Sequence, residues 1–314
     1  MASRTKVPST EDLVGASIRG KKFDVVGTAV ALGLLLTVFV SVGILVTLVS
    51  DMLIKGWSVF AERGLDFVTS PLSPDPAKAG LSQGIFGSIV LMVFVVLVSF
   101  PLGVGAAIYL EEYARDNRLT RFIVANMRNL AGVPSIVYGL LGFTVFVQLL
   151  SGLTNGRTLV SGGLTLAVLV LPIMMITASE ALRAVPQTIR QAAYGVGATK
   201  WETIRHHVFP IALPAILTGS VLTLARAFGE SAPLLLAGAV LSNFFSAPAG
   251  TSYVSLVAES DYTALPIVVF NWARQPQKEF VAITAAGIVV LLAMLVLVNG
   301  VAIYLRDRAS RRAL

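Results

Sequence analysis

The stretch EALRAVPQTIRQAAYGVGATKWETIRHHVFPIALP, residues 180–214, decides the fold of this chain. It is polar and split by glycines, and the segments on both sides of it are apolar and long enough to cross a bilayer. Connections between helices usually take about 2–8 residues, so a plain linker does not explain this length. The stretch therefore predicts a folded loop that two membrane spans present to another molecule outside the lipid.

Composition also indicates a membrane protein, because 55% of the residues are apolar and only 13% are charged. A helix needs about 20 apolar residues to cross the hydrocarbon, and the chain shows no strand-like alternation. We therefore predict an all-α, polytopic membrane helical bundle with six transmembrane helices, forming one domain over residues 25–305 between tails at 1–24 and 306–314. The expected spans are 25–49, 85–110, 130–150, 159–179, 213–241 and 281–305.

The 24 Lys and Arg residues are distributed unevenly in this six-span arrangement. Seventeen fall on the side of both tails and the loop 180–212, six fall on the other side, and Arg226 falls within a span. Cytoplasmic loops carry the excess of Lys and Arg, so we expect both termini and the loop in the cytoplasm. Topology then accounts for the net charge of +7 without a nucleic-acid partner. The chain has no cysteine, which excludes disulfides and thiolate metal sites.

Within the long loop, the residues predict two short helices joined at a corner. Pro186 suits the start of the first helix, and Gly195 and Gly197 end it because glycine adopts positive φ without strain. Thr199 and Glu202 have the spacing of a capping box, which predicts a second helix that runs to about residue 210. The small residues expected at the corner are Ala192, Ala193, Gly197 and Ala198.

The fifth predicted span contains two charges, Arg226 and Glu230, four residues apart. A charge at that depth costs about 2.5–3.5 kcal/mol on insertion scales, so it needs a reason. Gly229 and Pro233 permit a local break of the helix beside the pair. One interpretation is an ion pair that only fastens this helix to its neighbours. The other is a polar path in which Arg226 binds an anionic solute with its planar fork of donors.

The loop resembles the EAA loop of ABC-importer permeases in Gln191-Ala192-Ala193, followed by Gly197 and then Phe209-Pro210. The resemblance implies a type I ABC-importer permease fold in which this loop docks a cytoplasmic ATPase. The docking residues that it implies are Gln191, Ala192, Ala193, Gly197, Thr199 and Glu202. The chain departs from the family pattern at Gln191, where Glu is usual, and at His207 and Phe209.

A second resemblance narrows the family. The run ARAFGESAPLL at 225–235, the run ALPIVVFNWA at 264–273 and the first half of the loop are similar to the PstA-type permeases of phosphate importers. This resemblance implies that Arg226 and Glu230 take part in phosphate passage. It also implies a PstC-like second permease, a PstB-like ATPase dimer, a PstS-like external binding protein and a place in the bacterial inner (plasma) membrane, in contact with lipid. The partner ATPase would bind ATP and Mg²⁺, with no cofactor in this chain.

Three other functions are weighed against phosphate import. The chain has no G-x-x-x-x-G-K-[ST] motif, and its only histidines, His206 and His207, lie in the loop, so neither ATP hydrolysis nor intramembrane proteolysis is expected. A permease for sulfate or molybdate is not separated from a phosphate permease by arginine geometry. A membrane sensor or scaffold that docks an ATPase without passing solute is the remaining alternative, and the charge pair argues against it.

Overall fold

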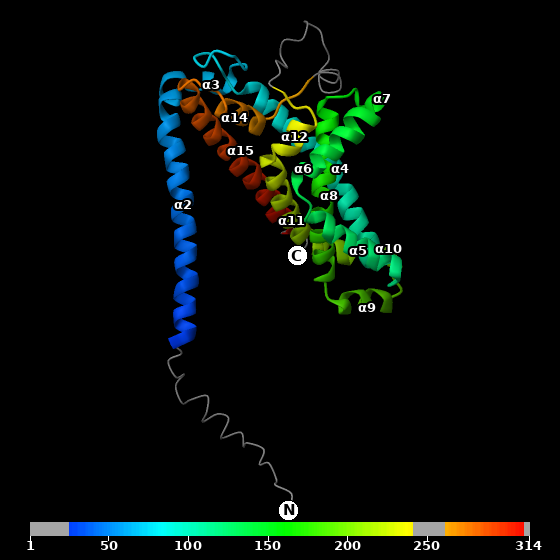
Figure 1. Ribbon diagram of the computed structural model, residues 1–314. Coiled ribbons are helices and arrows are strands. Elements are labelled where there is room, and N and C mark those ends of the chain that lie inside the picture. The colour runs from blue at the N-terminus through cyan, green and yellow to red at the C-terminus, as the bar shows by residue number, and fades with distance from the viewer. Residues whose placement is uncertain (1–24, 241–260, 311–314) are drawn as a thin grey trace, which may run out of the picture. The chain divides into compact units, whose positions relative to one another are not determined.

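The computed structural model describes residues 25–240 and 261–310, and within them the chain is helical without strands (Figure 1). The predicted N-terminal tail, residues 241–260 and residues 311–314 lie outside the described residues. The elements are α2 (Val25–Arg63), α3 (Asp66–Thr69), α4 (Ser82–Ile108) with the π-helical turn η1 (Tyr109–Tyr113), α5 (Arg118–Ala131), α6 (Ser135–Gly142) with η2 (Phe143–Leu149), α7 (Ser151–Thr154), α8 (Leu159–Arg183), α9 (Gln187–Gly195), α10 (Lys200–Thr203) with η3 (Ile204–Val208), α11 (Phe209–Gly229), α12 (Ala232–Leu236), α14 (Leu265–Ala273) and α15 (Glu279–Ser310).

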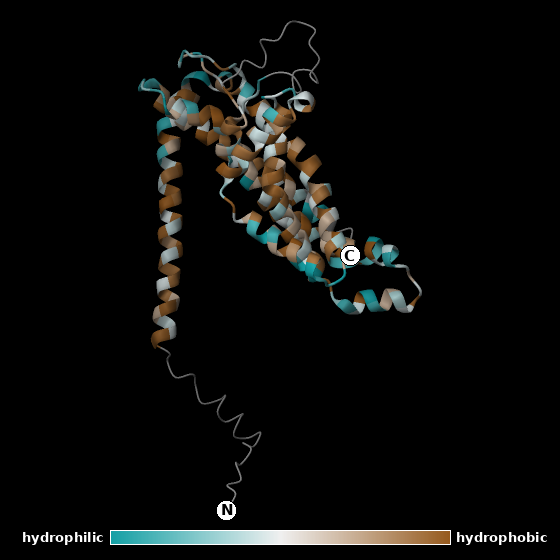
Figure 2. Cartoon of the chain, turned by 45° about the vertical axis from the view of Figure 1, so that its right-hand side comes forward, coloured by the Kyte–Doolittle hydropathy of each residue, from teal (hydrophilic) through white to brown (hydrophobic). Residues whose placement is uncertain are grey.

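Five of these helices are long and apolar enough to cross a membrane, or six if the bent pair Arg118–Ala131 and Ser135–Leu149 is one span. This agrees with the predicted all-α bundle of six spans. Hydrophobic residues follow the long helices, and hydrophilic residues gather at α9, α10 and the connections between helices (Figure 2). Several helices run past the predicted limits: α2 continues to Arg63, α4 begins at Ser82, α8 continues to Arg183, and α15 includes residues 306–310 of the predicted tail.

The chain divides into two units, residues 1–51 and residues 52–314. The described part of the first unit belongs to α2, and its apolar side chains are exposed, as expected for a helix that lies in lipid. In the second unit, α4, α8 and α11 share a core of small and branched residues: Val104, Ala107, Ala178, Ala181, Leu182, Val185, Val208, Ala212 and Ile216. This core lies at the end of the unit from which α9 departs.

The third predicted span is wrong in its limits. Residues 118–131 form the amphipathic helix α5, and the chain then bends by 102° into α6, so the apolar helix begins at Ser135 rather than at residue 130. Pro134 is the cause, because proline disfavours the helical region for the preceding residue and itself suits a helix start. Its backbone is extended, at φ −56° and ψ 137°.

The fifth predicted span is also wrong in its limits. The helical run begins at Lys200, passes Pro210 and Pro214 and ends at Gly229, so the second helix of the loop does not stop near residue 210. The π-helical turn η3 lies directly before Pro210. A π turn widens the backbone and relieves the clash between a proline ring and the carbonyl four residues earlier, which explains why the helix continues.

Candidate functional site: the elbow and the Arg226–Glu230 pair

The elbow, residues 187–203, consists of α9, a tight turn and α10 (Figure 1). Pro186 is the N-cap of α9, and Gly197 in the turn has φ +88°, a value that favours glycine. Thr199 and Glu202 form the predicted capping box, because the Glu202 carboxylate accepts the Thr199 N–H at 2.8 Å and the Thr199 hydroxyl accepts the Glu202 N–H at 3.3 Å. The two-helix corner predicted from the sequence is therefore confirmed.

The six predicted docking residues do not share one surface. Gln191, Ala192, Gly197, Thr199 and Glu202 are exposed, whereas Ala193 is buried. The corner also exposes three large side chains that the sequence analysis did not select: Tyr194, Val196 and Trp201. The sequence could have pointed to them, because large aromatic and aliphatic side chains beside small residues in a polar loop are typical of interfaces. Ala193 packs inside the chain, so its side chain is not part of the exposed surface of the elbow.

A buried arginine at the base of the elbow was also missed. Arg190 lies in α9, and its Nε and Nη2 donate to Glu112 Oε1 at 3.1 and 2.7 Å. Its Nη1 donates to the Val185 carbonyl at 2.8 Å and its Nη2 to the Leu182 carbonyl at 3.0 Å. The Arg190 and Glu112 side chains are 9% and 6% exposed. One guanidinium therefore links α9, the end of α8 and the π turn after α4.

Two further contacts reach the same turn η1. Arg183 Nε donates to Glu111 Oε2 at 2.6 Å, and Lys200 Nζ lies 5.1 Å from the centre of the Tyr113 ring. Little in the sequence indicated these contacts. Two neighbouring acidic residues stand at the end of a span, and the basic residues that bind them were counted only for topology. Distance along the chain hid the partners, since Arg190 and Glu112 are 78 positions apart.

Arg226 and Glu230 lie at the other end of α11. Arg226 is in the last turn of the helix, and Glu230 follows that end with an extended backbone. The prediction that both residues lie within the fifth span is wrong for Glu230, because the helix ends at Gly229, where the predicted break occurs. The pair does form, with Nε to Oε1 at 3.5 Å and side chains 50% and 17% exposed. Among the described residues Glu230 is the one hydrogen-bond and ion-pair partner of the Arg226 guanidinium, so donors remain for another anion.

The break after α11 packs against the second interrupted span. Gly139 of α6 lies against α12, and a Cβ added at Gly139 would come within 2.7 Å of Pro233 Cα. The Tyr138 hydroxyl donates to the Leu130 carbonyl at 2.9 Å, across the bend between α5 and α6. Two interrupted helices thus meet beside Arg226, an arrangement that many transporters use for substrate sites because it brings polar backbone groups inside the membrane.

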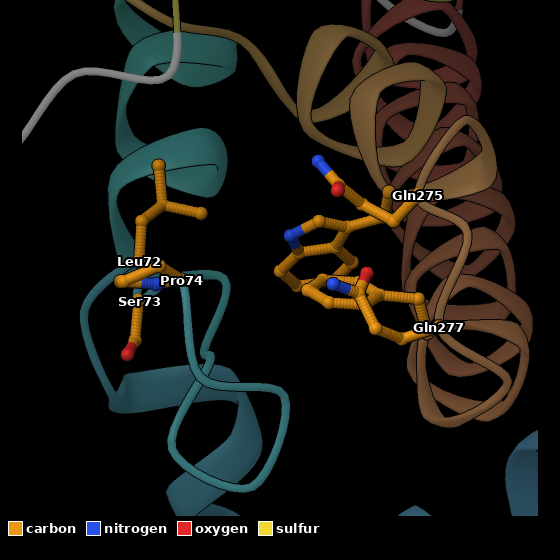
Figure 3. A pocket seen from close by; sticks show the side chains of 7 residues that line it. Leu72, Ser73, Pro74, Gln275 and Gln277 are labelled. Carbon is orange, nitrogen blue, oxygen red and sulfur yellow. The ribbon is translucent and has the colours of Figure 1, made fainter.

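A cavity of about 400 Å³ lies between the segment before α4 and the α14–α15 connection (Figure 3). Leu72, Ser73 and Pro74 lie on one side, and Gln275 and Gln277 lie on the other. The buried rings of Trp272 and Phe280 complete the lining. The lining residues carry no charge, so this cavity offers no cation to an oxyanion, and Arg226 is the better candidate.

Comparison with known proteins agrees with this architecture. The chain is 36% identical to the probable ABC transporter permease protein YqgI of Bacillus subtilis (strain 168) over 61% of this chain, and spans 63% of that relative. It is 33% identical to the phosphate transport system permease protein PstA of Xylella fastidiosa (strain 9a5c), over 75% of this chain and 78% of that relative. A solved structure of the MetNI methionine ABC transporter in an inward-facing conformation matches with a TM-score of 0.55 at 18% identity, over 74% of this chain and 96% of that one.

The likeness to the MetNI structure, at that identity, supports the fold alone, which is that of type I ABC-importer permeases. A family described as binding-protein-dependent transport system inner membrane component matches residues 99–311, more than half of the chain. That range contains the elbow, both interrupted spans and the Arg226–Glu230 pair. The chain therefore belongs to the family of binding-protein-dependent transport system inner membrane components, as a multi-pass permease of the PstA type.

Proposed function

We propose that this chain is a permease subunit of an ATP-driven importer of inorganic phosphate. The observation that carries the proposal is its 33% identity to a relative named as a phosphate transport system permease, together with an exposed arginine beside two interrupted spans. A PstC-like permease would complete the path, a PstS-like protein would deliver phosphate from outside, and a PstB-like dimer would bind ATP and Mg²⁺. Both termini and the elbow would lie in the cytoplasm of a bacterial cell.

Arg226 would bind the phosphate in this path. Its guanidinium has five donors and stays charged at physiological pH, and within the part of the chain that the structure describes a single contact, at 3.5 Å to Glu230, restrains it. Glu230 would hold the arginine when phosphate is absent and release it when an oxyanion competes. Sulfate and molybdate have similar geometry, so the identity of the oxyanion rests on the relatives.

Uptake of radiolabelled oxyanions tests the substrate. A strain lacking this gene and every other phosphate uptake route would receive the gene on a plasmid, and phosphate, sulfate and molybdate uptake would be compared. We expect phosphate uptake alone to be restored. Restored uptake of sulfate or molybdate instead would identify that oxyanion as the substrate. ATPase activity without phosphate flux, in liposomes that contain the purified complex, would favour a scaffold that docks an ATPase.

The exposed side chains at the corner of the elbow are proposed to contact the ATPase. Val196→Asp combined with Trp201→Glu places charge on side chains that are exposed, so the chain should still fold. We expect the ATPase to be lost from the purified complex and uptake to be abolished. Leu153→Asp, an equally exposed apolar site on α7, is the matched control and should retain both. Normal ATPase binding in the double variant would show that the elbow docks nothing.

A further inference from the structure

The Arg190–Glu112 pair is too expensive to be explained by stability alone. Removing both charges from water costs several kcal/mol, and apolar residues of similar volume often stabilise a protein as much or more. The side chains are nevertheless 9% and 6% exposed, and four hydrogen bonds hold the guanidinium. Such a pair is better suited to fixing one geometry than to adding stability.

The geometry that it fixes is the junction between the elbow and the bundle. Arg190 lies on α9, one turn before the exposed Tyr194, and its partners belong to two other elements. Glu112 ends the α4 run, while Leu182 and Val185 contribute carbonyls at the end of α8. The chain enters α9 through the connection at residues 184–186 and leaves it through the Gly197 turn, two non-helical connections at which the backbone direction can change.

Without the Arg190–Glu112 pair, a displacement of α9 could be taken up by bending of the two connections on either side of it. With it, α9 moves together with the ends of α4 and α8. Those ends share the packed core that includes Val104, Leu182 and Ala212 of α11, so the displacement reaches α11 as well. Close-packed interiors transmit displacement because they have few voids in which to absorb it.

We propose that Arg190 and Glu112 are positioning residues that transmit movement of the ATPase on the elbow to α4, α8 and, through their shared core, α11. This inference rests on the proposed function and adds a route to it. The carbonyls of Leu182 and Val185 contribute to the same positioning, because they accept hydrogen bonds that direct the guanidinium toward Glu112. In the neighbouring pair the Arg183 side chain is 55% exposed and that of Glu111 11%, and a hydrogen bond of 2.6 Å joins them.

The test uses the complete transporter with ATPase and binding protein in liposomes. Glu112→Gln leaves Arg190 charged and without its carboxylate, which can also destabilise the fold. The decisive variant therefore combines Glu112→Gln with Arg190→Met, which removes both charges and keeps an apolar stem of similar length. We expect this double variant to bind the ATPase like the parent and to lose less stability than Glu112→Gln alone, because it leaves no unpaired buried charge.

Transport should nevertheless fall by roughly tenfold in that double variant, with ATP hydrolysis retained, in the range that coupling changes usually produce. The readout is phosphate transported per ATP hydrolysed, which a purely structural pair would not alter once stability is restored. Arg121→Gln with Asp116→Asn removes an exposed pair, 70% and 85% exposed, and should leave the ratio unchanged.

Two results would overturn the proposal: a double variant that transports like the parent, or a Glu112→Gln variant with unchanged stability and coupling. Failure of the proposed function is seen separately, because the parent complex itself would then show no ATPase binding or no phosphate flux.

Discussion

Two arginines lie at opposite ends of α11: Arg190 in the elbow that precedes it, and Arg226 in its last turn. They differ in how many of their hydrogen-bond donors are already bound by the protein. Arg190 is 9% exposed and makes four hydrogen bonds, to a carboxylate and two carbonyls. Arg226 is 50% exposed and has one contact at 3.5 Å. The first has its donors committed to the fold, whereas the second has donors available for a ligand. The same residue type is thus held by the fold at one end and, under the proposed function, offered to a ligand at the other.

The backbone produces this difference. Arg190 lies in α9, which follows α8 after the short connection at residues 184–186, so carbonyls at the end of α8 that lack helical partners accept its donors. Arg226 precedes a break that leads Glu230 out of the helix, so its best partner is held at a longer distance. The 21 residues of α11 separate the two ends by about 32 Å at 1.5 Å per residue. A movement that starts at the elbow must cross that length to affect the anion.

The largest effect is expected at the exposed arginine. Arg226→Leu removes the cation proposed to bind phosphate, and a hydrogen bond to a charged group is worth about 1.5–3 kcal/mol, so uptake should fall by about 10- to 100-fold. Arg226→Lys keeps the charge but loses the planar fork, and should retain partial uptake with a raised KM. Uptake kinetics in the deletion strain measure both. The comparison fails if Arg226→Leu transports normally while its ATPase remains bound.

A smaller effect tests what holds the break beside Arg226. The Cβ of Gly139→Ala would meet the Pro233 backbone, which cannot move aside as a side chain does, so the variant should lose about 1–3 kcal/mol of stability. Gly105→Ala, in α4 with no neighbouring atom within 4 Å, is the matched control and should gain about 0.5–1 kcal/mol. Thermal unfolding of the purified complex measures both. Equal stability of the two variants would mean that α6 does not support α12.

These two regions also show how far sequence reasoning reaches. Pro186, Gly197, Thr199 and Glu202 act within a few positions, so the corner and its capping box could be predicted from local chemistry. The break at Gly229 was predicted for the same reason. The Arg190–Glu112 pair could not be, because it depends on how α4 and α8 pack, and neither residue is unusual at its position.

The errors in span limits have a related cause. Hydropathy detects apolar residues but not the direction of the backbone, and the wrong start of each of these two spans lies near a proline whose effect depends on its surroundings. The chain bends by 102° at the break that contains Pro134, whereas the π turn before Pro210 accommodates that proline and the helix continues. The same residue type ended one helix and not the other. The burial of Ala193 follows similarly, because its side of α9 is determined by the packing beneath the elbow.

The smallest expected effect separates local from tertiary support within the elbow. Thr199→Ala removes the hydroxyl that accepts the Glu202 N–H, and loss of such a cap costs about 0.5–2 kcal/mol. The start of α10 should then exchange its amide hydrogens faster, while α9 keeps its protection because Arg190 holds it. Thr218→Ala, which removes an exposed hydroxyl that donates only to the Pro214 carbonyl at 2.9 Å, is the control. If α9 loses protection as much as α10 does, the buried pair is not what holds α9, and the contrast between the two arginines loses its structural basis.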